Sequence, residues 1–460
     1  MGEFSRLAVT TDHTACAHIG KDIMVVGGNA VDASIASMFC LGVMNPMSSG
    51  LGGGFLLTLF NSSTGKCVAV DARETAPAAA NETMFTHDEN ANKKGYLAIG
   101  VPSELAGYWE AFNRFGSGKV KWADLVAPTI KILEEGVPVS TYLAKAMKQY
   151  EEGFRESPTM SCWLDPSTNS TYKEDERMFH PQLLRTFNGL FVCGGLYPNA
   201  SRADLYGDTK VWHNLIEAMK FAMAQRSRMG DGVPEAKTLA HLLVSPAYVE
   251  GLVKKIKHTA QEDDYYGGDG KYVPNDHGTS HVSVLDGDGN GVSVTTTINR
   301  RFGALVESES LGILWNNEMD DFSTPGQSNV YGIPPAERNF IFPGKRPLSS
   351  MSPLVVFDKD SKKVRMVAGS SGGVSIPSSL AQVVTRTLVF GDSIKEAIDA
   401  PRVHNQFLPN VTRFETRFNQ VCNYFFCKSE PTKGIEVTRE GLIRASGDFR
   451  RETNQTTAGL

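Results

Sequence analysis

The sequence predicts an α+β protein in which packed β-sheets lie between layers of helices. Between residues 104 and 260, apolar residues recur at three- and four-residue spacing, which is the periodicity of amphipathic helices. After Thr279 the pattern changes to short runs that alternate polar and apolar residues, which is typical of paired strands, and helical periodicity returns after residue 378. Helices, then paired strands, then helices favour sheets with helices on their outer faces.

The composition is typical of a globular protein with a sizeable core. Of the 460 residues, 41% are hydrophobic and 21% are charged. The formal net charge of -5 provides no basic surface, so we expect no nucleic acid as a partner. The sequence shows neither a signal-peptide pattern nor an apolar run of membrane-spanning length.

Seven cysteines occur in the chain, and no two of them form a C-x-x-C pair. They are Cys16, Cys40, Cys67, Cys162, Cys193, Cys422 and Cys427. Zinc and redox motifs built on such pairs are therefore absent, and we expect neither a metal ion nor a cofactor. The odd count leaves at least one thiol unpaired or paired between chains.

Asn-x-Ser/Thr sequences, the acceptors of N-glycosylation, occur six times. They begin at Asn61, Asn81, Asn169, Asn199, Asn410 and Asn454. Each one is a weak signal, but together they favour a glycoprotein of the secretory pathway, where disulfides are permitted. Because no targeting segment accompanies them, either the true N-terminus lies outside this sequence or the acceptors are not used.

The first elements expected are two helices over residues 13–45, interrupted at Gly27 and Gly28. Asn29 is the expected N-cap of the second helix. The glycine-rich residues 50–54 follow. They lack the Lys-Ser/Thr of a phosphate-binding loop, so we expect them to allow close backbone packing.

A hairpin is expected next, with strands over residues 55–61 and 67–72. Its second strand runs directly into Arg73. An arginine at a strand end is usually a solvated charge or part of a surface ion pair. It becomes a clamp for a ligand only if other segments place it in a pocket.

The remaining elements alternate between helices and hairpins. Helices are expected over residues 104–115, 122–135, 142–154, 205–224 and 239–257. Hairpins are expected from residues 279–286 with 292–299, and from residues 353–357 with 364–368. The last two helices are expected over residues 378–390 and 394–400.

The junction between Gly278 and Thr279 opens the first strand of the second hairpin. Glycine adopts backbone conformations that are closed to other residues, and a strained Gly-Thr peptide can be attacked by the threonine hydroxyl and cut. The product is a threonine whose free α-amine, with an ordinary pKa of ~7.7–8.0, can act as the base for its own hydroxyl. The alternative is a threonine that simply begins a strand, and the junction alone leaves both interpretations open.

Seven short segments combine unusual polar residues. They are residues 71–77, 278–281, 295–299, 316–322, 347–351, 369–373 and 401–406. In their order and near-family spacing, from about residue 8 to about residue 415, they resemble the γ-glutamyltranspeptidase (glutathione hydrolase) family. The resemblance implies an N-terminal-nucleophile hydrolase fold, an αββα four-layer sandwich. It also implies self-cleavage into a large subunit, 1–278, and a small catalytic subunit, 279–460, which stay together as a heterodimer.

The resemblance implies a pocket for the zwitterionic head group of glutathione, its conjugates and other γ-glutamyl compounds. The implied substrate-binding residues are Arg73, Asn299, Glu318, Asp321, Ser349 and Ser350. An arginine fork and two hydroxyls suit an α-carboxylate, whereas carboxylates and an amide suit an α-ammonium. Burying a zwitterion is costly unless each charge is met. For any one of the acidic residues, the alternative to a role in binding is a place in a solvated acidic loop. Asp320 is included here, although its neighbour Asp321 takes the position that matches the family.

The resemblance implies four catalytic residues, Thr279, Thr297, Gly372 and Gly373. Thr279 would attack the γ-amide carbonyl and form an ester, which passes its acyl group to water, an amino acid or a dipeptide. The amides of the two glycines would form the oxyanion hole, and Thr297 would orient the nucleophile. His281 shares a strand face with Thr279, but the free amine already supplies a base and the resemblance gives His281 no role.

The resemblance also implies a disulfide between Cys16 and Cys40 and a location outside the cell, either secreted or on the outer face of the plasma membrane. The anchor helix of the family's membrane-bound animal members is not present in this sequence. Residues 418–436 depart from the family pattern, so we expect the C-terminal strand region to pack poorly.

Two other functions are compatible with parts of the pattern. One is another amidase of the same fold, such as a cephalosporin-type acylase, although Arg73, the serine pair and the acidic loop suit an amino-acid head group better. The other is a folded, uncleaved precursor that serves as a surface or scaffold protein. Denaturing electrophoresis would separate these cases, because two fragments indicate an enzyme and one band indicates the scaffold.

Overall fold

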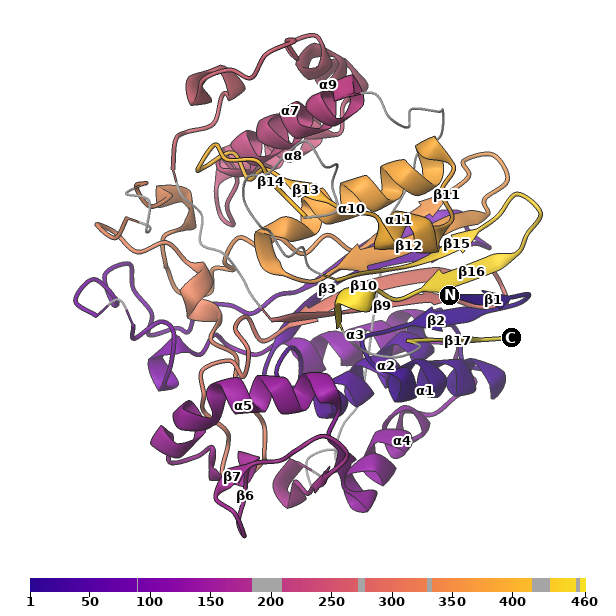
Figure 1. Ribbon diagram of the computed structural model, residues 1–460, viewed down its shortest axis with the longest axis vertical. Helices are drawn as coiled ribbons and strands as arrows, with labels where there is room; N and C mark the ends of the chain where they lie inside the picture. Colours follow the sequence, from indigo (N-terminus) through magenta and orange to yellow (C-terminus); the bar gives the residue numbers. More distant parts are fainter. Residues whose placement is uncertain (89, 184–208, 272–277, 329–332, 416–430, 452–455) are drawn as a thin grey trace.

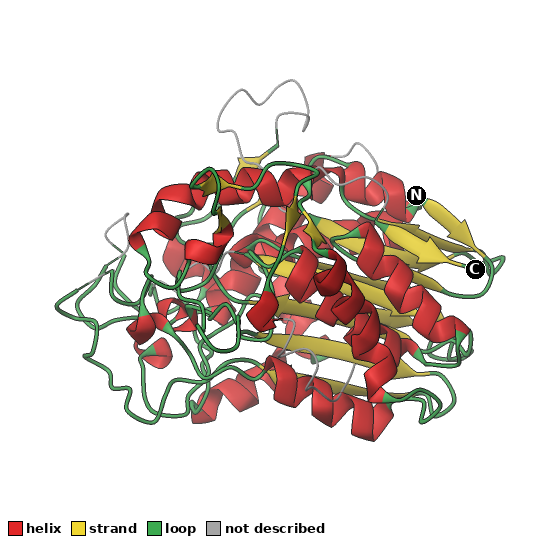
Figure 2. Cartoon of the chain, turned by 90° about the horizontal axis from the view of Figure 1, so that it is seen from below, coloured by secondary structure: helices red, strands yellow, loops and turns green. Residues whose placement is uncertain are grey.

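Two β-sheets lie face to face at the centre of the protein, and helices cover the outer face of each sheet (Figure 1). The computed structural model describes residues 1–88, 90–183, 209–271, 278–328, 333–415, 431–451 and 456–460. Seen from below, the strands again form the middle of the molecule between helices (Figure 2). The predicted arrangement of packed sheets with helices outside is confirmed.

The first sheet has six antiparallel strands among the described residues. Its order is β17 (Thr457–Gly459), β2 (Ala8–Thr10), β9 (Thr279–Leu285), β10 (Gly291–Thr297), β3 (Gly54–Asn61) and β4 (Lys66–Ala72). The hairpins β3–β4 and β9–β10 are the predicted ones. Strands from before and after residue 278 therefore pair with one another within one sheet.

The second sheet has five antiparallel strands in the described part of the chain. Its order is β1 (Gly2–Phe4), β16 (Ile443–Ser446), β15 (Thr432–Val437), β12 (Val364–Ser370) and β11 (Leu354–Phe357). The predicted hairpin of residues 353–357 and 364–368 is β11–β12. Every residue of β15 except the last is buried. The expectation that the C-terminal strands pack poorly is therefore wrong, because they pair with strands from distant parts of the chain.

Both faces of β9 and β10 are covered, and every residue of the two strands is buried. Val282 and Val284 pack into the apolar cluster that includes the helices below the sheet. Polar residues at alternate positions face the other sheet, where Ser293 Oγ donates to the backbone oxygen of Ala368 over 2.9 Å. On the helical side, the polar residues Ser280 and Thr296 bond to Asn45 and Glu104. The polar–apolar alternation therefore marks two buried environments rather than one buried and one solvated face.

Among the described residues, one group of helices lies on the outer side of the six-stranded sheet and a second group lies on the outer side of the other sheet (Figure 1). The first group is α1 (Thr14–Val25), α2 (Ala30–Met44), α3 (Glu104–Phe115) and α4 (Trp122–Glu135). The second group is α10 (Ile376–Thr385), which continues as a π-helical turn (Arg386–Phe390), and α11 (Ile394–Asp399). The predicted N-cap is confirmed, because the Asn29 side chain accepts from the N–H groups of Val31 and Asp32. The Asp32 carboxylate in turn accepts from the N–H of Asn29.

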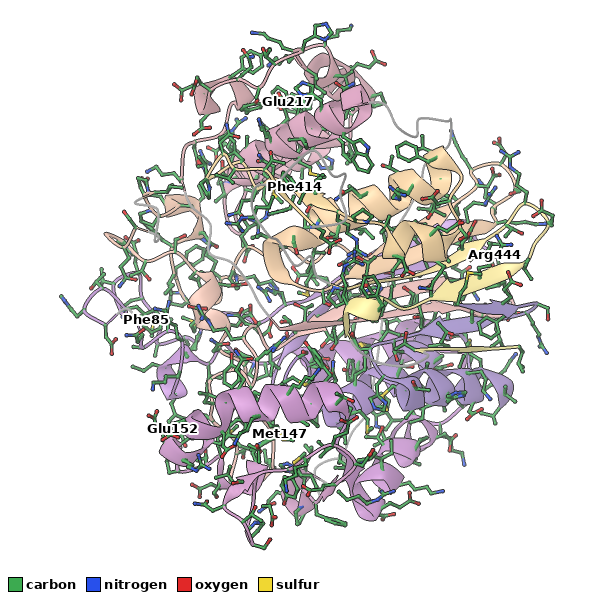
Figure 3. All side chains as sticks on the ribbon, in the orientation of Figure 1. Phe85, Met147, Glu152, Glu217, Phe414 and Arg444 are labelled. Atoms are coloured by element: carbon green, nitrogen blue, oxygen red, sulfur yellow. A yellow bond between two sulfur atoms is a disulfide. The ribbon has the colours of Figure 1, made fainter. Side chains whose placement is uncertain are left out.

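Two further groups of elements flank the sandwich (Figure 1). One contains β5 (Val137–Pro138), α5 (Thr141–Glu156), β6 (Leu164–Asp165), β7 (Ser170–Thr171) and β8 (Arg177–Met178). The other contains α7 (Thr209–Arg226), α8 (Pro234–Leu243), α9 (Pro246–Val253), β13 (Val403–His404) and β14 (Arg413–Phe414). Met147 on α5 and Glu217 on α7, labelled in Figure 3, mark the two groups at opposite ends of the view.

One predicted helix is wrong in extent. Residues 239–257 were expected to form one helix, but α8 ends at Leu243 and α9 begins at Pro246. Proline lacks the N–H that a continuing helix needs, and it disfavours helical geometry in the residue before it. The first four residues of the helix expected at 205–224 lie outside the described residues.

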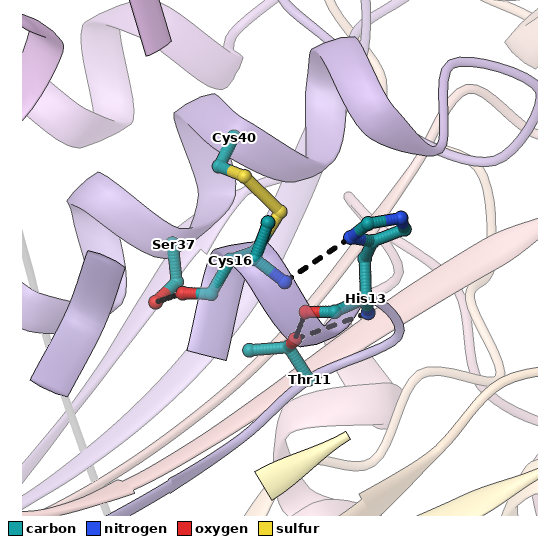
Figure 4. Close-up of a disulfide and its surroundings, with 6 residues drawn as sticks. Thr11, His13, Cys16, Ser37 and Cys40 are labelled. Carbon is teal, nitrogen blue, oxygen red and sulfur yellow. Dashed lines mark hydrogen bonds between the residues drawn. A yellow bond between two sulfur atoms is a disulfide. The ribbon is translucent and has the colours of Figure 1, made fainter. Parts of the chain in front are cut away.

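The implied disulfide between Cys16 and Cys40 is confirmed, and it joins α1 to α2 (Figure 4). Beside it, Ser37 Oγ donates to the backbone oxygen of Cys16 over 3.0 Å. Of the other cysteines, Cys67 and Cys162 are free thiols. Cys193, Cys422 and Cys427, and the glycosylation acceptors Asn199 and Asn454, lie outside the described residues. None of the described helices is both long and apolar enough to span a bilayer.

Removal of the Cys16–Cys40 disulfide is expected to destabilise the protein. The bond joins residues 24 positions apart, so it restricts the unfolded chain and contributes about 3 kcal/mol to the free energy of unfolding. We expect the double variant Cys16→Ala/Cys40→Ala to lose about that amount in urea unfolding. Cys67→Ser, which removes a free thiol, is the control and should lose less. Equal unfolding midpoints for the wild type and the double variant would contradict the expectation.

Candidate active site

Thr279 begins β9 and is buried, with 1% of its surface exposed. In the register between β9 and β10 its partner is Thr297, the last residue of β10. Two of the four predicted catalytic residues therefore lie opposite each other at the same end of one hairpin.

The hydroxyl of Thr297 is fixed by two backbone groups. It donates to the carbonyl oxygen of Gly278 over 2.9 Å and accepts from the N–H of Asn299 over 2.9 Å. The carbonyl belongs to the peptide bond between Gly278 and Thr279. A donor at this oxygen polarises the carbonyl carbon and would stabilise negative charge if that carbon were attacked.

Glycines let the backbone close around this junction. Gly278 has φ of +87°, and a methyl group on it would stand 2.6 Å from the backbone oxygen of Asn299. A methyl group on Gly53 would stand 2.1 Å from the backbone oxygen of Thr297. The expectation that residues 50–54 serve close backbone packing is thereby confirmed, and the strand that they approach is β10.

Arg73 follows β4, is 2% exposed, and lies among carboxylates. Its Nη1 lies 2.6 Å from Glu318 Oε1 and 3.6 Å from Glu74 Oε2, and its Nη2 bonds to Asp321 Oδ2. Arg73 and Asp321 are 248 residues apart in sequence. The structure therefore brings together three predicted substrate-binding residues, and here the arginine is neutralised by the protein's own carboxylates.

Two asparagines hold the short 3₁₀ turn Glu318–Asp321 that carries these carboxylates. Asn316 Oδ1 accepts from the N–H of Glu318 over 2.8 Å, and its Nδ2 donates to the backbone oxygen of Gly52 over 2.7 Å. The backbone oxygen of Asn317 accepts from Asn299 Nδ2 over 3.1 Å. Sequence reasoning gave neither Asn316 nor Asn317 a role, although both belong to the polar segment it identified.

Asp320 is separated from this ionic cluster by its own partner. Its Oδ2 lies 2.5 Å from Nε of Arg300, a side chain that is 38% exposed. Asp320, which does not take a position that matches the family, is therefore part of a partly solvated ion pair with Arg300.

Ser349 and Ser350 have contacts of their own. Ser350 Oγ accepts from Arg226 Nη2 over 2.9 Å, and Ser349 Oγ accepts from the N–H of Met351 over 3.1 Å. Arg226 is the last residue of α7. The helical group around α7 therefore reaches the serine pair through a charged side chain that the sequence did not single out.

Asn339 connects the serine segment to the acidic loop. Its Nδ2 donates to the backbone oxygen of Asp321 over 2.7 Å, and its Oδ1 accepts from the N–H of Leu348 over 3.0 Å. Asn339 is 1% exposed, so both bonds are shielded from water. Its position between two predicted binding segments was not visible in the sequence.

Gly372 and Gly373 lie in the turn between β12 and α10, with φ of +109° and +63°. Such values favour glycine, and N–H groups at the start of a helix are unpaired donors. The turn follows closely after Gly369, where a methyl group would stand 2.2 Å from the His281 ring. The strand that leads to the two glycines therefore packs directly on the face of β9 that carries His281 and Thr279.

His281 is a structural residue in this arrangement. It is fully buried, its Nδ1 lies 2.8 Å from Thr295 Oγ1, and its Nε2 lies 2.9 Å from Ser283 Oγ. Burial, with Lys433 nearby, lowers the pKa of His281 to about 3. A neutral imidazole with both nitrogens engaged agrees with the expectation that it is not the catalytic base.

Two buried carboxyl groups lie behind the cluster. Burial raises the pKa of Glu74 to about 7, although Arg73 acts in the opposite direction. Burial raises the pKa of Glu104 to about 8, although Tyr108 and Thr296 donate hydrogen bonds to it. Thr296 precedes Thr297, so Glu104 supports β10 from the helical side.

Comparisons with known proteins identify the family of this chain and agree with its fold. A family model described as "Gamma-glutamyltranspeptidase" matches residues 16–194 and 195–425. Scoloptoxin SSD14 of Scolopendra dehaani is 33% identical over 98% of this chain and 92% of its own. Glutathione hydrolase 3 of Arabidopsis thaliana is 34% identical, and the match covers 92% of this chain and 76% of that protein. Glutathione hydrolase 5 proenzyme of Mus musculus is 31% identical, and the match covers 91% of this chain and 85% of that protein.

The fold also occurs in a solved structure. The cephalosporin acylase from Bacillus halodurans superposes with a TM-score of 0.78 over 100% of this chain and 96% of its own, at 19% identity. The fold is the αββα sandwich of the N-terminal-nucleophile hydrolases, as expected. Within that class, the chain belongs to the γ-glutamyltranspeptidase family of enzymes.

The raised pKa of Glu104 predicts a pH-dependent stability. The fold favours the neutral carboxyl, so this stabilisation is complete below the ordinary pKa of 4.5 and is lost as the pH rises through about 8. Glu104→Gln is neutral at every pH and keeps an acceptor for Tyr108. Its melting temperature relative to the wild type is therefore expected to increase between about pH 5 and about pH 9.

Glu110→Gln is the matched control for this experiment. Glu110 lies on the same helix, is exposed, and pairs with Arg114. We expect no comparable gain with pH in this variant. If the melting temperatures of Glu104→Gln and the wild type differed by the same amount at every pH, the assignment of a raised pKa to Glu104 would be wrong.

Proposed function

We propose that this protein hydrolyses and transfers γ-glutamyl groups through an ester on Thr279, which self-cleavage converts into an N-terminal residue. The observation that carries the proposal is the hydrogen bond from Thr297 to the carbonyl oxygen of Gly278 at the head of β9. It supports attack at this particular peptide bond, because the acceptor is the carbonyl that cleavage requires. The family membership supports the γ-glutamyl chemistry.

In the proposed maturation, Thr279 Oγ attacks the carbonyl carbon of Gly278. The carbon–nitrogen bond breaks, the nitrogen takes up a proton as the α-amine of Thr279, and the Gly278 acyl group is held as an ester on Thr279 Oγ. Water hydrolyses this ester and leaves a carboxylate on Gly278. The relative named a proenzyme is consistent with such a precursor.

The proposed fragments, 1–278 and 279–460, would remain associated after cleavage. β9 pairs with β2 on one side, and β10 pairs with β3 on the other. β2 and β3 belong to the first fragment, whereas β9 and β10 belong to the second. Separating the fragments would break these ladders and expose fully buried strands, which supports a permanent heterodimer.

In the proposed reaction, the free amine of Thr279 takes the hydroxyl proton as Thr279 Oγ attacks the γ-amide carbonyl of the donor. The N–H groups of Gly372 and Gly373 would stabilise the oxyanion, and Thr297 would orient the nucleophile. The amine then passes the proton to the leaving nitrogen, and the γ-glutamyl ester remains. Attack by water completes hydrolysis, and attack by an amino acid or dipeptide amine completes transfer.

Donor binding would use the charges gathered around Arg73. The α-carboxylate of glutathione or another γ-glutamyl compound would pair with Arg73 and the hydroxyls of Ser349 and Ser350. The α-ammonium would pair with Glu318 and Asp321, next to Asn299. Arg73, Glu318 and Asp321 are 1–2% exposed in the intact chain, so binding requires Arg73 to exchange protein carboxylates for that of the donor. The similarity to a cephalosporin acylase concerns the fold alone and does not favour that alternative.

We also propose that the protein acts in an oxidising compartment, as a secreted glycoprotein or on the outer face of the plasma membrane. The Cys16–Cys40 disulfide supports this location, because such bonds persist outside the reducing cytosol. The glycosylation acceptors Asn81, Asn169 and Asn410 are exposed, which supports their use.

Substitution of Thr279 tests the proposal directly. We expect the wild type to give two bands on a denaturing gel, and Thr279→Ala to give one band with no release of chromophore from a γ-glutamyl anilide. A dipeptide should accelerate release by the wild type. Thr297→Val should slow cleavage by about 10²–10³, because it removes a donor to the attacked carbonyl.

Thr296→Val is the matched control, because it removes a neighbouring buried hydroxyl whose partner is Glu104. We expect it to be cleaved like the wild type. Fragments from Thr279→Ala, or activity in uncleaved wild-type protein, would refute the proposed nucleophile.

Substitution of Arg73 separates donor binding from maturation. Arg73→Lys keeps a positive charge among the buried carboxylates but loses the planar fork. We expect kcat/KM for a γ-glutamyl anilide to decrease about 10–100-fold while cleavage remains complete. Arg300→Lys, which changes the nearby pair with Asp320, is the control and should change kcat/KM little. If Arg73→Lys impaired cleavage and turnover equally, Arg73 would have a structural role rather than a role in donor binding.

A further inference from the structure

Three side chains with metal-binding atoms meet on the side of the six-stranded sheet that carries α5. Cys162 lies in the 3₁₀ turn Ser161–Trp163, His180 follows β8, and Glu307 lies in the segment between β10 and the turn Glu318–Asp321. The ligand atoms of all three side chains lie within 4.8 Å of one another. This group shares no residue with the predicted active site.

The separations are close to those around one tetrahedral ion. Cys162 Sγ lies 3.2 Å from Glu307 Oε1, and His180 Nδ1 lies 3.9 Å from the same oxygen. Zinc bonds to sulfur, nitrogen and oxygen ligands of about 2.0–2.3 Å place neighbouring tetrahedral ligands about 3.3–3.7 Å apart. Small side-chain rotations are therefore enough to direct the three atoms at a common centre.

His180 supplies an independent reason to place a ligand here. Its side chain is 3% exposed, and neither ring nitrogen has a hydrogen-bond partner. Leaving such a group unsatisfied in the interior is costly, and buried polar side chains are nearly always paired.

The surroundings hold Glu307 in place and leave room for a further ligand. Trp163 Nε1 donates to Glu307 Oε2 over 2.7 Å, and the N–H of Glu307 donates to Thr159 Oγ1 over 3.1 Å. Contacts of this kind orient the ligands of metal sites. A small cavity lined by His180, Trp163 and Leu314, among others, adjoins the imidazole and has room for one water molecule.

We propose that Cys162, His180 and Glu307 bind one zinc ion, with water as the fourth ligand. Thiolate, imidazole and carboxylate together suit zinc rather than magnesium or calcium. The ion replaces the thiol–carboxyl hydrogen bond of the metal-free site, and the proton of the thiol passes to solvent. The expectation of no metal rested on the absence of C-x-x-C pairs, and these ligands are spread over 146 positions, from 162 to 307.

The ion would connect two parts of the fold. Cys162 and His180 belong to the group of elements around α5, whereas Glu307 precedes Glu318 in the segment that reaches the Arg73 cluster. After the proposed cleavage, the first two ligands would lie in one fragment and the third in the other. Zinc would then fasten the fragments together, but its binding does not require that cleavage occurs.

Metal binding is tested with the purified full chain after treatment with a chelator. We expect titration with Co²⁺ to reach one ion per chain with a thiolate-to-cobalt band in the near ultraviolet, and stoichiometric Zn²⁺ to abolish the band. Cys162→Ser should lose the band and bind zinc at least about tenfold more weakly. Cys67→Ser, the other free thiol in the described part of the chain, is the matched control and should keep both.

A stability measurement covers the case in which Cys162→Ser folds poorly. We expect zinc to raise the melting temperature of the wild type and of Cys67→Ser, but not that of His180→Leu, which fills the same space without a ligand. No cobalt band in the wild type, an unchanged band in Cys162→Ser, or the same zinc-induced shift in His180→Leu would overturn the proposal. Because these readouts do not involve turnover, their outcome is independent of the proposed γ-glutamyl chemistry.

Discussion

The antiparallel pairing of β9 with β10 is the interaction on which the rest of the site depends. Its register sets Thr279 opposite Thr297, and this position lets the Thr297 hydroxyl reach the carbonyl of Gly278. A shift of one residue would turn every side chain of β9 to the opposite face. Such a shift would place valines against the other sheet and polar residues against the helices, so burial on both faces holds the register.

A second constraint is electrostatic, because Arg73 is buried among Glu318, Asp321 and Glu74. Removing one member of a buried ionic group leaves an uncompensated charge, which costs far more than a surface ion pair. The asparagines that fix the acidic turn therefore matter for stability as well as for geometry. They hold the carboxylates close to Arg73, whose guanidinium is buried and therefore cannot be stabilised by water instead.

Local patterns were sufficient to predict most of the helices, the hairpins, the Asn29 cap and the residues at the head of β9, because turns, caps and periodicity act over a few positions. The family resemblance supplied Arg73, Glu318 and Asp321 as a set. What neither source revealed depends on contacts between distant residues. No short stretch of sequence signals these contacts. They are the bond between Arg226 and Ser350, the position of Asn339 between two segments, and the group of Cys162, His180 and Glu307.

The charge balance of the Arg73 cluster supports the proposal that this cluster binds an amino-acid head group. One guanidinium faces two close carboxylates, and the third, Glu74, is partly neutral near pH 7 because burial raises its pKa to about 7. A zwitterion that enters adds one charge of each sign, so every charge that loses a partner gains another and the net charge is unchanged. An apolar acyl group in the same place would separate Arg73 from its carboxylates without supplying a new charge for either of them. The guanidinium and the carboxylates would then be buried without ionic partners, which is costly. In the proposed mode of donor binding, the buried network that stabilises the fold would therefore also select against donors without a charged head group.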